Sequence, residues 1–323
     1  MIKAGIMGGE ELKAGELIRL LINHPDVEIQ WINSHIHEGD LVSDIHQGLT
    51  GDFYMRFTDE PSLADIDVLF MCTRDGESSS FLEAQEIPEN LRIIDLSMDY
   101  RLPHPNNSFV YGLPELNRKP MVRGARHVAC PGGFATAIEL ALLPLAKNLL
   151  LKGDIHITAI TGSTGADAKR SSSTHDYWPN DNVALYRPLQ HHHMPEITNT
   201  ITTVQSGYAD TVNFVPMVAS FSRGIMVVIC MDAPAALSRV QDMYEEYYSD
   251  HSFTFVKDTP IDLKDVVNTN KCLIHIDRIG DKMVITSVID NLLKGASGTA
   301  VHCMNLLFGL QERVGLALKA SAF

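Results

Sequence analysis

The chain has 323 residues, of which 45% are hydrophobic and 20% charged, and its formal net charge is −14. This length suits two domains with sizeable cores, and the composition is that of a soluble globular protein. The acidic balance excludes the basic surfaces that nucleic acids and anionic membranes require, so we expect neither as a partner.

Cysteine usage and the first residues predict a cytoplasmic protein. The cysteines are odd in number, show no Cys-x-x-Cys spacing and indicate reduced, buried thiols, at Cys72, Cys130, Cys230, Cys272 and Cys303. "MIKAGIMGGEE" leads straight into a strand pattern without a signal peptide, and no apolar run reaches membrane-spanning length.

The first 130 residues predict a doubly wound α/β domain. A helical pattern at 14–24 lies between the first two of five apolar, strand-like stretches, at residues 2–7, 27–33, 67–73, 91–97 and 127–132. A β-α-β unit of about 30 residues is the length of a parallel crossover, and nearly continuous Val, Ile and Leu is typical of buried parallel strands.

After a long helical pattern at 134–151 the alternation changes and predicts an α+β domain. Strand patterns occur at 154–161, 212–221 and 224–231, and two apolar runs flank Gly280-Asp281 as a hairpin would. Helical patterns at 236–249 and 299–318 complete the chain. Hairpin-linked strands favour a mostly antiparallel sheet backed by helices.

A glycine-rich loop, "GIMGGEELKAGE", follows the first strand. Gly5 and Gly8 have the spacing of a dinucleotide-binding loop, whose N–H groups contact a pyrophosphate. The third glycine of that pattern is replaced by Glu11, beside Glu10. Like charges about 4 Å apart at an effective dielectric constant of about 20 repel by roughly 4 kcal/mol. Weak dinucleotide binding and a turn that binds nothing both stay open.

The second strand ends in Asn33-Ser34-His35, without the acidic residue that holds the ribose 2′-hydroxyl of NAD. A cofactor bound here would therefore be NADP rather than NAD.

The stretch "ACPGGFATA", residues 129–137, ends a strand and begins the long helix. Enzymes often hold a thiolate or an anionic substrate at such a turn, because the helix dipole and free N–H groups favour negative charge. The residue after the Pro-Gly turn is Gly133, which has no side chain. Cys130, three residues earlier, has two interpretations, a substitute nucleophile or a small buried hydrophobe.

Five motifs, in this order, resemble the N-acetyl-γ-glutamyl-phosphate reductase family: "DLSMDYRL" (95–102), "YGLPELNR" (111–118), "ITGSTGA" (160–166), "HHHMPEI" (191–197) and "NLLKGASG" (291–298). The resemblance runs from the first strand to the last helix. It implies an enzyme of arginine and ornithine biosynthesis that reduces an acyl phosphate to a semialdehyde with NADPH. A cysteine thiolate attacks the acyl phosphate, hydride reduces the thioester, and a histidine transfers protons.

The same resemblance implies an NADP-binding Rossmann-type domain at residues 1–132 and 300–323. It implies an α+β domain at 133–299, like the catalytic domain of glyceraldehyde-3-phosphate dehydrogenase. A small-molecule substrate and a homodimer or homotetramer are implied as well.

The resemblance also assigns roles to residues. The nucleophile position is Gly133, and His191 and His193 are the acid/base and a substrate contact. The substrate-binding positions are Ser97, Arg101, Thr164, Glu196, Arg223 and Lys294. The cofactor-binding positions are Gly5, Gly8, Gly9, Gly162, Gly165 and Asn291, to which we add Ser34 from the end of the second strand. The chain departs from the family pattern at Glu10, Glu11, Asp75, Gly133, Asp167 and Thr299.

The histidine run leaves a second interpretation. If residues 191–193 are extended, His191 and His193 share a face, with Glu196 one turn further on if a helix starts at Pro195. Proton transfer is the role that the resemblance implies. A His-x-His plus Glu metal site lacks a third histidine in a defined place, so we assign no metal.

Two hypotheses follow, because a glycine cannot supply the nucleophile that covalent acyl transfer needs. The first is a divergent NADPH-dependent N-acyl-γ-glutamyl-phosphate reductase. The second is a non-catalytic or repurposed member, natural or engineered, that acts as a binding or structural protein. We expect NADP to bind weakly because of Glu10 and Glu11.

Overall fold

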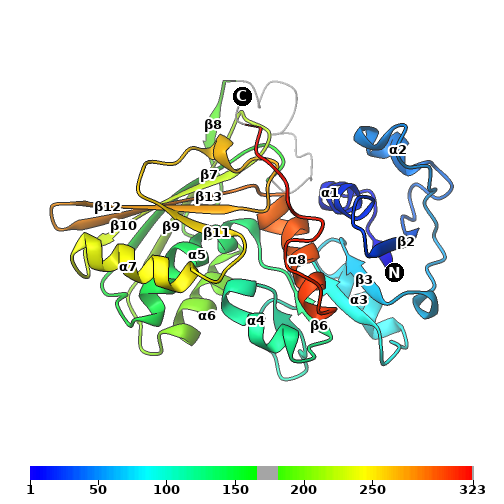
Figure 1. Ribbon diagram of the computed structural model, residues 1–323, viewed down its shortest axis with the longest axis horizontal. Helices are drawn as coiled ribbons and strands as arrows, with labels where there is room; N and C mark the ends of the chain where they lie inside the picture. The colour runs from blue at the N-terminus through cyan, green and yellow to red at the C-terminus, as the bar shows by residue number, and fades with distance from the viewer. Residues whose placement is uncertain (166–180, 322–323) are drawn as a thin grey trace. The chain divides into compact units, whose positions relative to one another are not determined.

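The computed structural model describes residues 1–165 and 181–321, and the chain divides into two compact units (Figure 1). Unit 1 comprises Met1–Pro131 and Ala296–Ala317, and unit 2 comprises Gly132–Gly295 and Leu318–Phe323. No helix among the described residues combines the length and apolar character that crossing a membrane requires.

Unit 1 contains a six-stranded sheet whose strands are all parallel. In spatial order the strands are β2 (Val27–Ile32), β1 (Ile2–Met7), β3 (Val68–Met71), β4 (Arg92–Asp95), β6 (His127–Ala129) and β5 (Val110–Tyr111). The helices are α1 (Leu12–Leu21), α2 (Val42–Ile45), α3 (Glu77–Ala84), α4 (Pro114–Val122) and α8 (Gly298–Leu307). The predicted doubly wound domain is confirmed.

Alternate residues of the central strands face opposite helix layers. Met7, Leu69 and Met71 pack in a cluster with Phe81 and Leu82 of α3. Helix α8 packs on α1, α4 and β4, and all its residues are buried. The strand order reverses between β1 and β3, and in such sheets ligands bind outside the carboxyl ends of the strands at this point.

The predicted C-terminal helix over 299–318 is wrong beyond residue 307. Helix α8 ends at Leu307, and Gly309 has a left-handed φ of +67° that turns the chain. Buried Asn305 then holds the following segment, because its amide donates to the carbonyls of Glu312 and Val314. The apolar periodicity continues after the helix has stopped.

Unit 2 contains a seven-stranded sheet in which four of the six strand pairs are antiparallel, as predicted. In spatial order the strands are β11 (Thr254–Lys257), β12 (Cys272–Ile279), β13 (Lys282–Ile289), β10 (Ile225–Asp232), β7 (Ile155–Thr161), β9 (Val212–Ala219) and β8 (Val183–Leu185). The predicted hairpin at Gly280-Asp281 joins β12 to β13.

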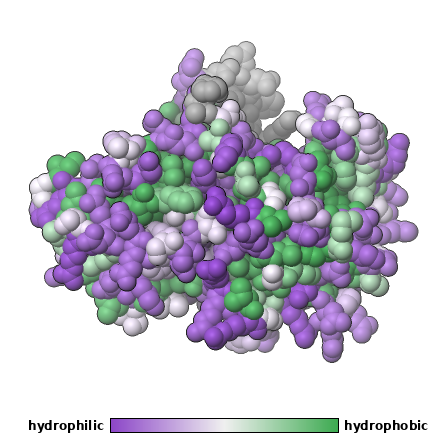
Figure 2. Space-filling view, in the orientation of Figure 1, coloured by the Kyte–Doolittle hydropathy of each residue, from purple (hydrophilic) through white to green (hydrophobic). Residues whose placement is uncertain are grey.

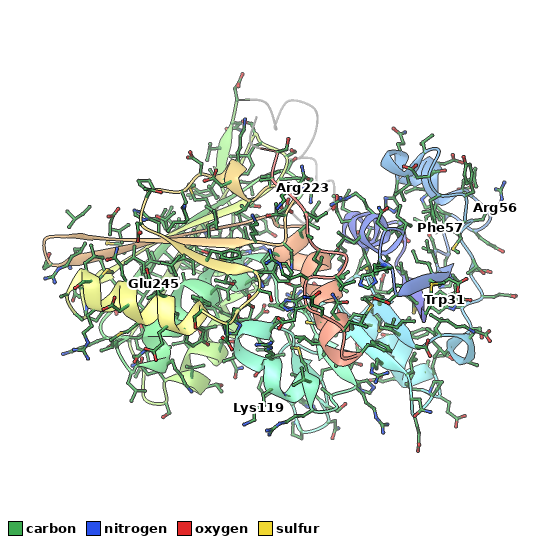
Figure 3. The ribbon with its side chains drawn as sticks, viewed as in Figure 1. Trp31, Arg56, Phe57, Lys119, Arg223 and Glu245 are labelled. Atoms are coloured by element: carbon green, nitrogen blue, oxygen red, sulfur yellow. The ribbon has the colours of Figure 1, made fainter. Side chains whose placement is uncertain are left out.

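Helices α5 (Gly133–Lys147), α6 (Met194–Val204) and α7 (Leu237–Tyr248) lie on one side of this sheet (Figure 1). The hydroxyl of Tyr244 in α7 donates to the carbonyl of Ala141 in α5 at 2.5 Å. The opposite side of α7 is polar, with Glu245 pointing outward (Figures 2 and 3). Ile225, Val227 and Ile229 of β10 are buried, whereas the intervening residues are half-buried on the other face of the sheet.

Candidate functional site

The loop between β1 and α1 needs its glycines for packing. A Cβ at Gly5 would lie 2.4 Å from the ring of Trp31, which Figure 3 labels. One at Gly9 would lie 2.3 Å from the Ile32 side chain, and one at Gly8 would lie 2.6 Å from the Cys72 carbonyl oxygen. Gly8 also has a φ of +68°. These contacts explain the glycines without a ligand and shape a turn that exposes the start of α1.

Two cations that the sequence analysis missed lie beside this loop. Arg74 donates from Nε to Oε1 of Glu11 at 2.9 Å, and this hydrogen bond raises the pKa of the Arg74 guanidinium. Lys13 donates from Nζ to the carbonyls of Thr73 at 2.8 Å and Leu96 at 3.2 Å, after the ends of β3 and β4. The charge of Glu11 is therefore partly compensated. The available signal was Lys13 in the first turn of a helix, where a cation opposes the dipole.

Ser34 follows the end of β2 and is one of the sequence-predicted cofactor positions. The residue is 2% exposed, and its hydroxyl makes no hydrogen bond within the described part of the chain. Oε2 of Glu10 is likewise buried and makes no hydrogen bond within the described residues. A buried hydroxyl without a partner costs free energy, so a ligand oxygen would stabilise Ser34, whereas Glu10 would oppose a phosphate.

Ser97, Arg101 and Cys130 lie around the carboxyl ends of β4 and β6. Buried Asp95 accepts from the Ser97 hydroxyl at 2.8 Å, and burial raises the pKa of the Asp95 carboxyl. Arg101 donates from Nε to the Cys130 carbonyl at 2.8 Å. The Cys130 thiol is 1% exposed, and its hydrogen bond with Cys303, followed by burial, raises its pKa well above the usual value. These surroundings keep the Cys130 thiol protonated.

Gly133 is the first residue of α5, and Gly132 is its N-cap. The N–H of Gly132 donates to Oε1 of buried Glu196 at 3.0 Å, which places a carboxylate at the positive end of the helix. A Cβ at Gly132 would lie 2.2 Å from Nε2 of His193. A Cβ at Gly133 would lie 2.9 Å from the terminal Cδ1 of Ile225. The next nearest atom to that Cβ is the Gly295 carbonyl oxygen, at 3.7 Å.

Residues 191–193 are not extended, which was the condition under which His191 and His193 were expected to share a face, yet both rings contact Phe134. The segment forms a turn in which the N–H of His193 donates to Nδ1 of His191 at 3.1 Å. His192 therefore also joins the group, and its ring stacks on His191 with centroids 4.1 Å apart. Burial, followed by the charges of His192 and Arg187, lowers the pKa of His191 to about 3. His191 is therefore neutral near neutral pH.

Arg223 is fixed by Asp290, a partner that the sequence analysis missed. Two guanidinium nitrogens of Arg223 donate to the two carboxylate oxygens of Asp290 at 3.1 and 3.0 Å. Asp290 is fully buried and also accepts backbone N–H groups from Asn268, Leu292 and Leu293. The pair holds a planar cation in one orientation, and Figure 3 labels Arg223.

Asn291 and Thr164 extend this group. Asn291 accepts the N–H of Gly224 at 2.6 Å and donates to the Thr164 hydroxyl at 3.1 Å. Gly162 and Gly165 are closely packed. A Cβ at Gly162 would lie 2.4 Å from the Phe221 carbonyl oxygen, and a Cβ at Gly165 would lie 2.2 Å from the Thr161 hydroxyl. Lys294 is fully buried, with Nζ 6.0 Å from the ring centroid of Phe253.

The remaining departures from the family pattern are Asp75, Thr299 and Asp167. Asp75 accepts the N–H of Met98 at 3.0 Å, and Thr299 is buried in α8. Asp167 lies outside the described residues. Asp75 therefore has a local structural role, as an acceptor for the turn that follows β4.

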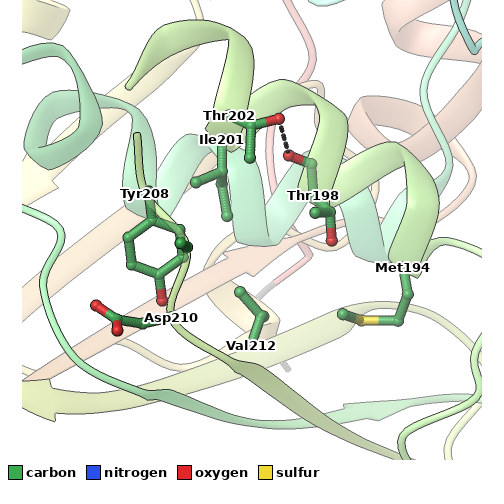
Figure 4. A pocket seen from close by; sticks show the side chains of 8 residues that line it. Met194, Thr198, Ile201, Thr202, Tyr208, Asp210 and Val212 are labelled. Atoms are coloured by element: carbon green, nitrogen blue, oxygen red, sulfur yellow. Dashed lines mark hydrogen bonds between the residues drawn. The ribbon is translucent and has the colours of Figure 1, made fainter. Parts of the chain in front are cut away.

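A cavity of about 200 Å³ lies beside α6 (Figure 4). It is lined by Met194, Thr198, Ile201, Thr202, Tyr208, Ala209, Asp210 and Val212. Its strongest polar groups are already used, since the Tyr208 hydroxyl donates to the Gly153 carbonyl and Asp210 accepts the Gly153 N–H. None of the predicted site residues lines it, so we place the candidate site elsewhere.

Two family models match the chain. One, described as semialdehyde dehydrogenase, NAD binding domain, matches residues 3–123, and the other, semialdehyde dehydrogenase, dimerisation domain, matches residues 133–291. These matches support a nicotinamide cofactor and a homo-oligomer.

Solved structures with the same fold include aspartate semialdehyde dehydrogenase with NADP from Candida albicans. Its TM-score is 0.72 at 15% identity, over 95% of this chain and 98% of that one. Aspartate semialdehyde dehydrogenase II complexed with ASA from Vibrio cholerae has a TM-score of 0.69 at 16% identity, over 96% and 98%. Identities this low show the fold alone.

Curated relatives named N-acetyl-gamma-glutamyl-phosphate reductase match along their whole length. Identity is 55% in Parabacteroides distasonis, 53% in Bacteroides thetaiotaomicron and 43% in Flavobacterium johnsoniae, with 100% of this chain and of each relative covered. The chain therefore belongs to the N-acetyl-gamma-glutamyl-phosphate reductase family, built from the NAD binding and dimerisation domains of semialdehyde dehydrogenases.

Proposed function

We propose that this chain keeps the ligand sites of an N-acyl-γ-glutamyl-phosphate reductase but does not perform its covalent step. The observation that carries the proposal is Gly133 at the first position of α5. The family reaction divides a difficult reduction into two steps through a thioester, and a residue without a side chain forms no thioester.

Cys130 does not replace the missing thiol. Its side chain is buried and its pKa is raised, so the nucleophilic thiolate is scarce near neutral pH. Arg101 also anchors the Cys130 backbone, which opposes the movement that a nucleophile at a displaced position would need.

The residues for an anionic ligand remain. Arg223, oriented by Asp290, is the cation that we assign to the phosphate or carboxylate of an N-acyl-glutamyl compound. His193 and Glu196 lie at the Gly132 turn, where they orient a bound acyl group and move its protons. Ser97, Arg101, Thr164 and Lys294 stay predictions as further substrate contacts.

NADP is the cofactor we propose, with the loop of Gly8 at its pyrophosphate and Ser34 at its adenosine ribose. A bound reduced nicotinamide supplies a hydride. Glu10 and Glu11 weaken binding, and Arg74 offsets only part of their charge. A dissociation constant for NADPH in the low micromolar range, measured by fluorescence titration, would contradict weak binding.

The second candidate is a reductase that works without a thioester. The retained Arg223–Asp290 pair favours it, because a half-buried cation oriented by a buried carboxylate is maintained in the unit that contains Gly133.

One experiment separates the two candidates. The unmodified chain and its Gly133→Cys and Gly133→Ala variants are assayed for NADP reduction with an N-acyl-glutamate semialdehyde and phosphate. We expect turnover only in Gly133→Cys, and Gly133→Ala controls for the added Cβ. Turnover by the unmodified chain would overturn the proposal. If Gly133→Cys is inactive, Ile225→Val is added to relieve the 2.9 Å contact, and continued inactivity with normal folding would show that the ligand sites are lost too.

We also propose that the assembly is a homodimer formed through the face of the seven-stranded sheet opposite α5, α6 and α7. Met226, Val228 and Cys230 of β10 lie half-buried on that face, and Val228 is in register with Thr158 and Thr286 of the neighbouring strands. Native mass measurement tests this, and a tetramer would show that a second interface exists.

A further inference from the structure

Three imidazoles converge immediately before α6. His191, His192 and His193 each offer one ring nitrogen, and these nitrogens lie within 4.8 Å of one another. The ring centroids are 4.1 Å apart for His191 and His192, 4.4 Å for His192 and His193, and 4.7 Å for His191 and His193. The turn produces this arrangement, since an extended segment would point His192 away from its neighbours.

Aromatic side chains surround this three-histidine cluster. Phe134 presents its ring edge-on to both His191 and His193, and Phe214 does so to His191. His191 and His193 are 3% and 8% exposed, while His192 is half-buried. An imidazole ring binds a metal through the lone pair of one ring nitrogen, and each of the three rings offers one such nitrogen to the cluster.

We propose that the three-histidine cluster binds one divalent transition-metal ion of the class that prefers imidazole nitrogen, represented by zinc, cobalt and nickel. Three protein ligands with an open fourth position is the arrangement of catalytic zinc sites. The proposal concerns binding alone and does not depend on the function proposed above.

The cluster needs only a small adjustment to hold an ion. Zinc–nitrogen bonds of about 2.0–2.1 Å place tetrahedral ligands about 3.4 Å apart, so the nitrogens must approach one another. His192 can turn inward, because it lies in a turn and is partly exposed. Nδ1 of His191 accepts the His193 N–H and therefore carries a lone pair, so coordination there costs this single hydrogen bond.

The position of the cluster gives the ion a chemical use. His193 packs on Gly132, so the site borders the turn where the nucleophile is absent. If an ion binds there, it would supply Lewis-acid character beside this turn, with His191, His192 and His193 holding it.

The test uses the untagged full-length protein, stripped with a chelator and dialysed. Co²⁺ is titrated while visible absorption is recorded, and Zn²⁺ binding is measured by calorimetry. We expect one ion per chain, a tetrahedral cobalt spectrum without thiolate charge-transfer bands, and at least a tenfold loss of affinity in each of His191→Gln, His192→Gln and His193→Gln.

His35→Gln and His37→Gln are the matched controls, since His35 and His37 form a His-x-His pair outside the cluster. Both should bind metal as the unmodified chain does. His192→Gln is the decisive variant, because the partly exposed His192 can be replaced with little effect on folding, which circular dichroism checks. Absence of binding, a thiolate–cobalt spectrum, unchanged affinity in His192→Gln, or an equal loss in a control would each overturn the proposal.

Discussion

Glu196 holds the start of α5 through one hydrogen bond, from the N–H of Gly132 to Oε1 at 3.0 Å, in a buried environment. The carboxylate accepts the N–H of the N-cap residue itself and places a negative charge at the positive end of the helix. Glu196→Ala leaves this N–H buried without its acceptor, and we expect the free energy of unfolding to fall by about 1–3 kcal/mol. Glu196→Gln keeps an acceptor oxygen and should lose less. Denaturant unfolding measures both, and equal losses would show that the hydrogen bond contributes nothing beyond charge.

The adjacent glycines of this turn should respond differently to alanine. Gly132→Ala places a Cβ 2.2 Å from Nε2 of His193, whose ring is enclosed by Phe134 and its neighbouring histidines. We expect a loss of about 1–3 kcal/mol, typical of overpacking. Gly133→Ala meets only the end of Ile225 and gains helix propensity, so its stability should change by less than about 1 kcal/mol. Thermal unfolding of the two variants compares them directly, and the reverse order would refute the packing argument.

The Cys130 thiol should resist alkylation in the folded protein. Its high pKa and burial leave almost no accessible thiolate at about pH 8, and burial likewise raises the pKa of Cys72 to about 12. We expect mass spectrometry after iodoacetamide treatment to find both residues unmodified, and any residual turnover unchanged. The same treatment in denaturant should label all five cysteines. Selective modification of Cys130 with loss of activity would restore it as a nucleophile.

Affinity for NADPH should follow the charges around the glycine loop. Arg74→Ala leaves Glu11 unpaired near the pyrophosphate, and we expect about a tenfold weaker dissociation constant, or about 1.4 kcal/mol. Glu11→Ala should strengthen binding by a similar factor. The effects of both substitutions on the dissociation constant should be smaller at high salt, because the Arg74 side chain is 63% exposed. Lys119→Ala, an exposed lysine elsewhere in unit 1, is the control; a similar effect there would show that net charge alone matters.

Acid should destabilise unit 1 through His24. Nδ1 of His24 accepts the Asp26 N–H at 3.2 Å, Nε2 lies 3.1 Å from Oδ1 of Asn305, and burial lowers the pKa of the ring. Between the two pKa values, His24 is therefore protonated in the unfolded chain but neutral in the folded chain. The contribution of neutral His24 to the free energy of unfolding is fully present above the unfolded pKa, near 6.5. It is lost as the pH drops towards the lower folded pKa. Unfolding at about pH 7.5 and about pH 5.5 measures this loss.

His24→Gln should reduce that pH dependence, whereas His104→Gln, at an exposed position, should leave it unchanged. Identical pH profiles for His24→Gln and the unmodified chain would assign the acid sensitivity to other groups.

The local pattern was sufficient for most strands and helices. The four residues of β3 are all buried, so an unbroken apolar run identified the strand, and the turn at Gly280 has the left-handed φ of +64° that a Gly-Asp hairpin suggests. The pattern failed after Leu307, where hydrogen bonds from Asn305 decide the path of the chain. Side-chain hydrogen bonds of this kind leave no periodic signal in the sequence.

The candidate site was predictable only where a motif covered it. Gly133 and Glu196 lie in quoted motifs and Arg223 was assigned through the family resemblance, but the partners that orient them were not predicted. Arg223 meets Asp290 from 67 residues away, and Glu11 meets Arg74 from 63 residues away. The convergence of His192 with its neighbours depends on a turn closed by a single side-chain hydrogen bond, whereas alternation assumes a straight chain.

The return of α8 to unit 1 has a consequence for how the protein is made. The interior unit is almost one continuous segment, Gly132–Gly295, and is available as soon as that segment leaves the ribosome. The N-terminal unit must wait for Ala296–Ala317, since α8 covers β4 and contacts α1 and α4. Until residues 296–317 have been synthesised, the apolar surface that α8 will bury stays exposed on the nascent chain, and chaperones or aggregation compete for it.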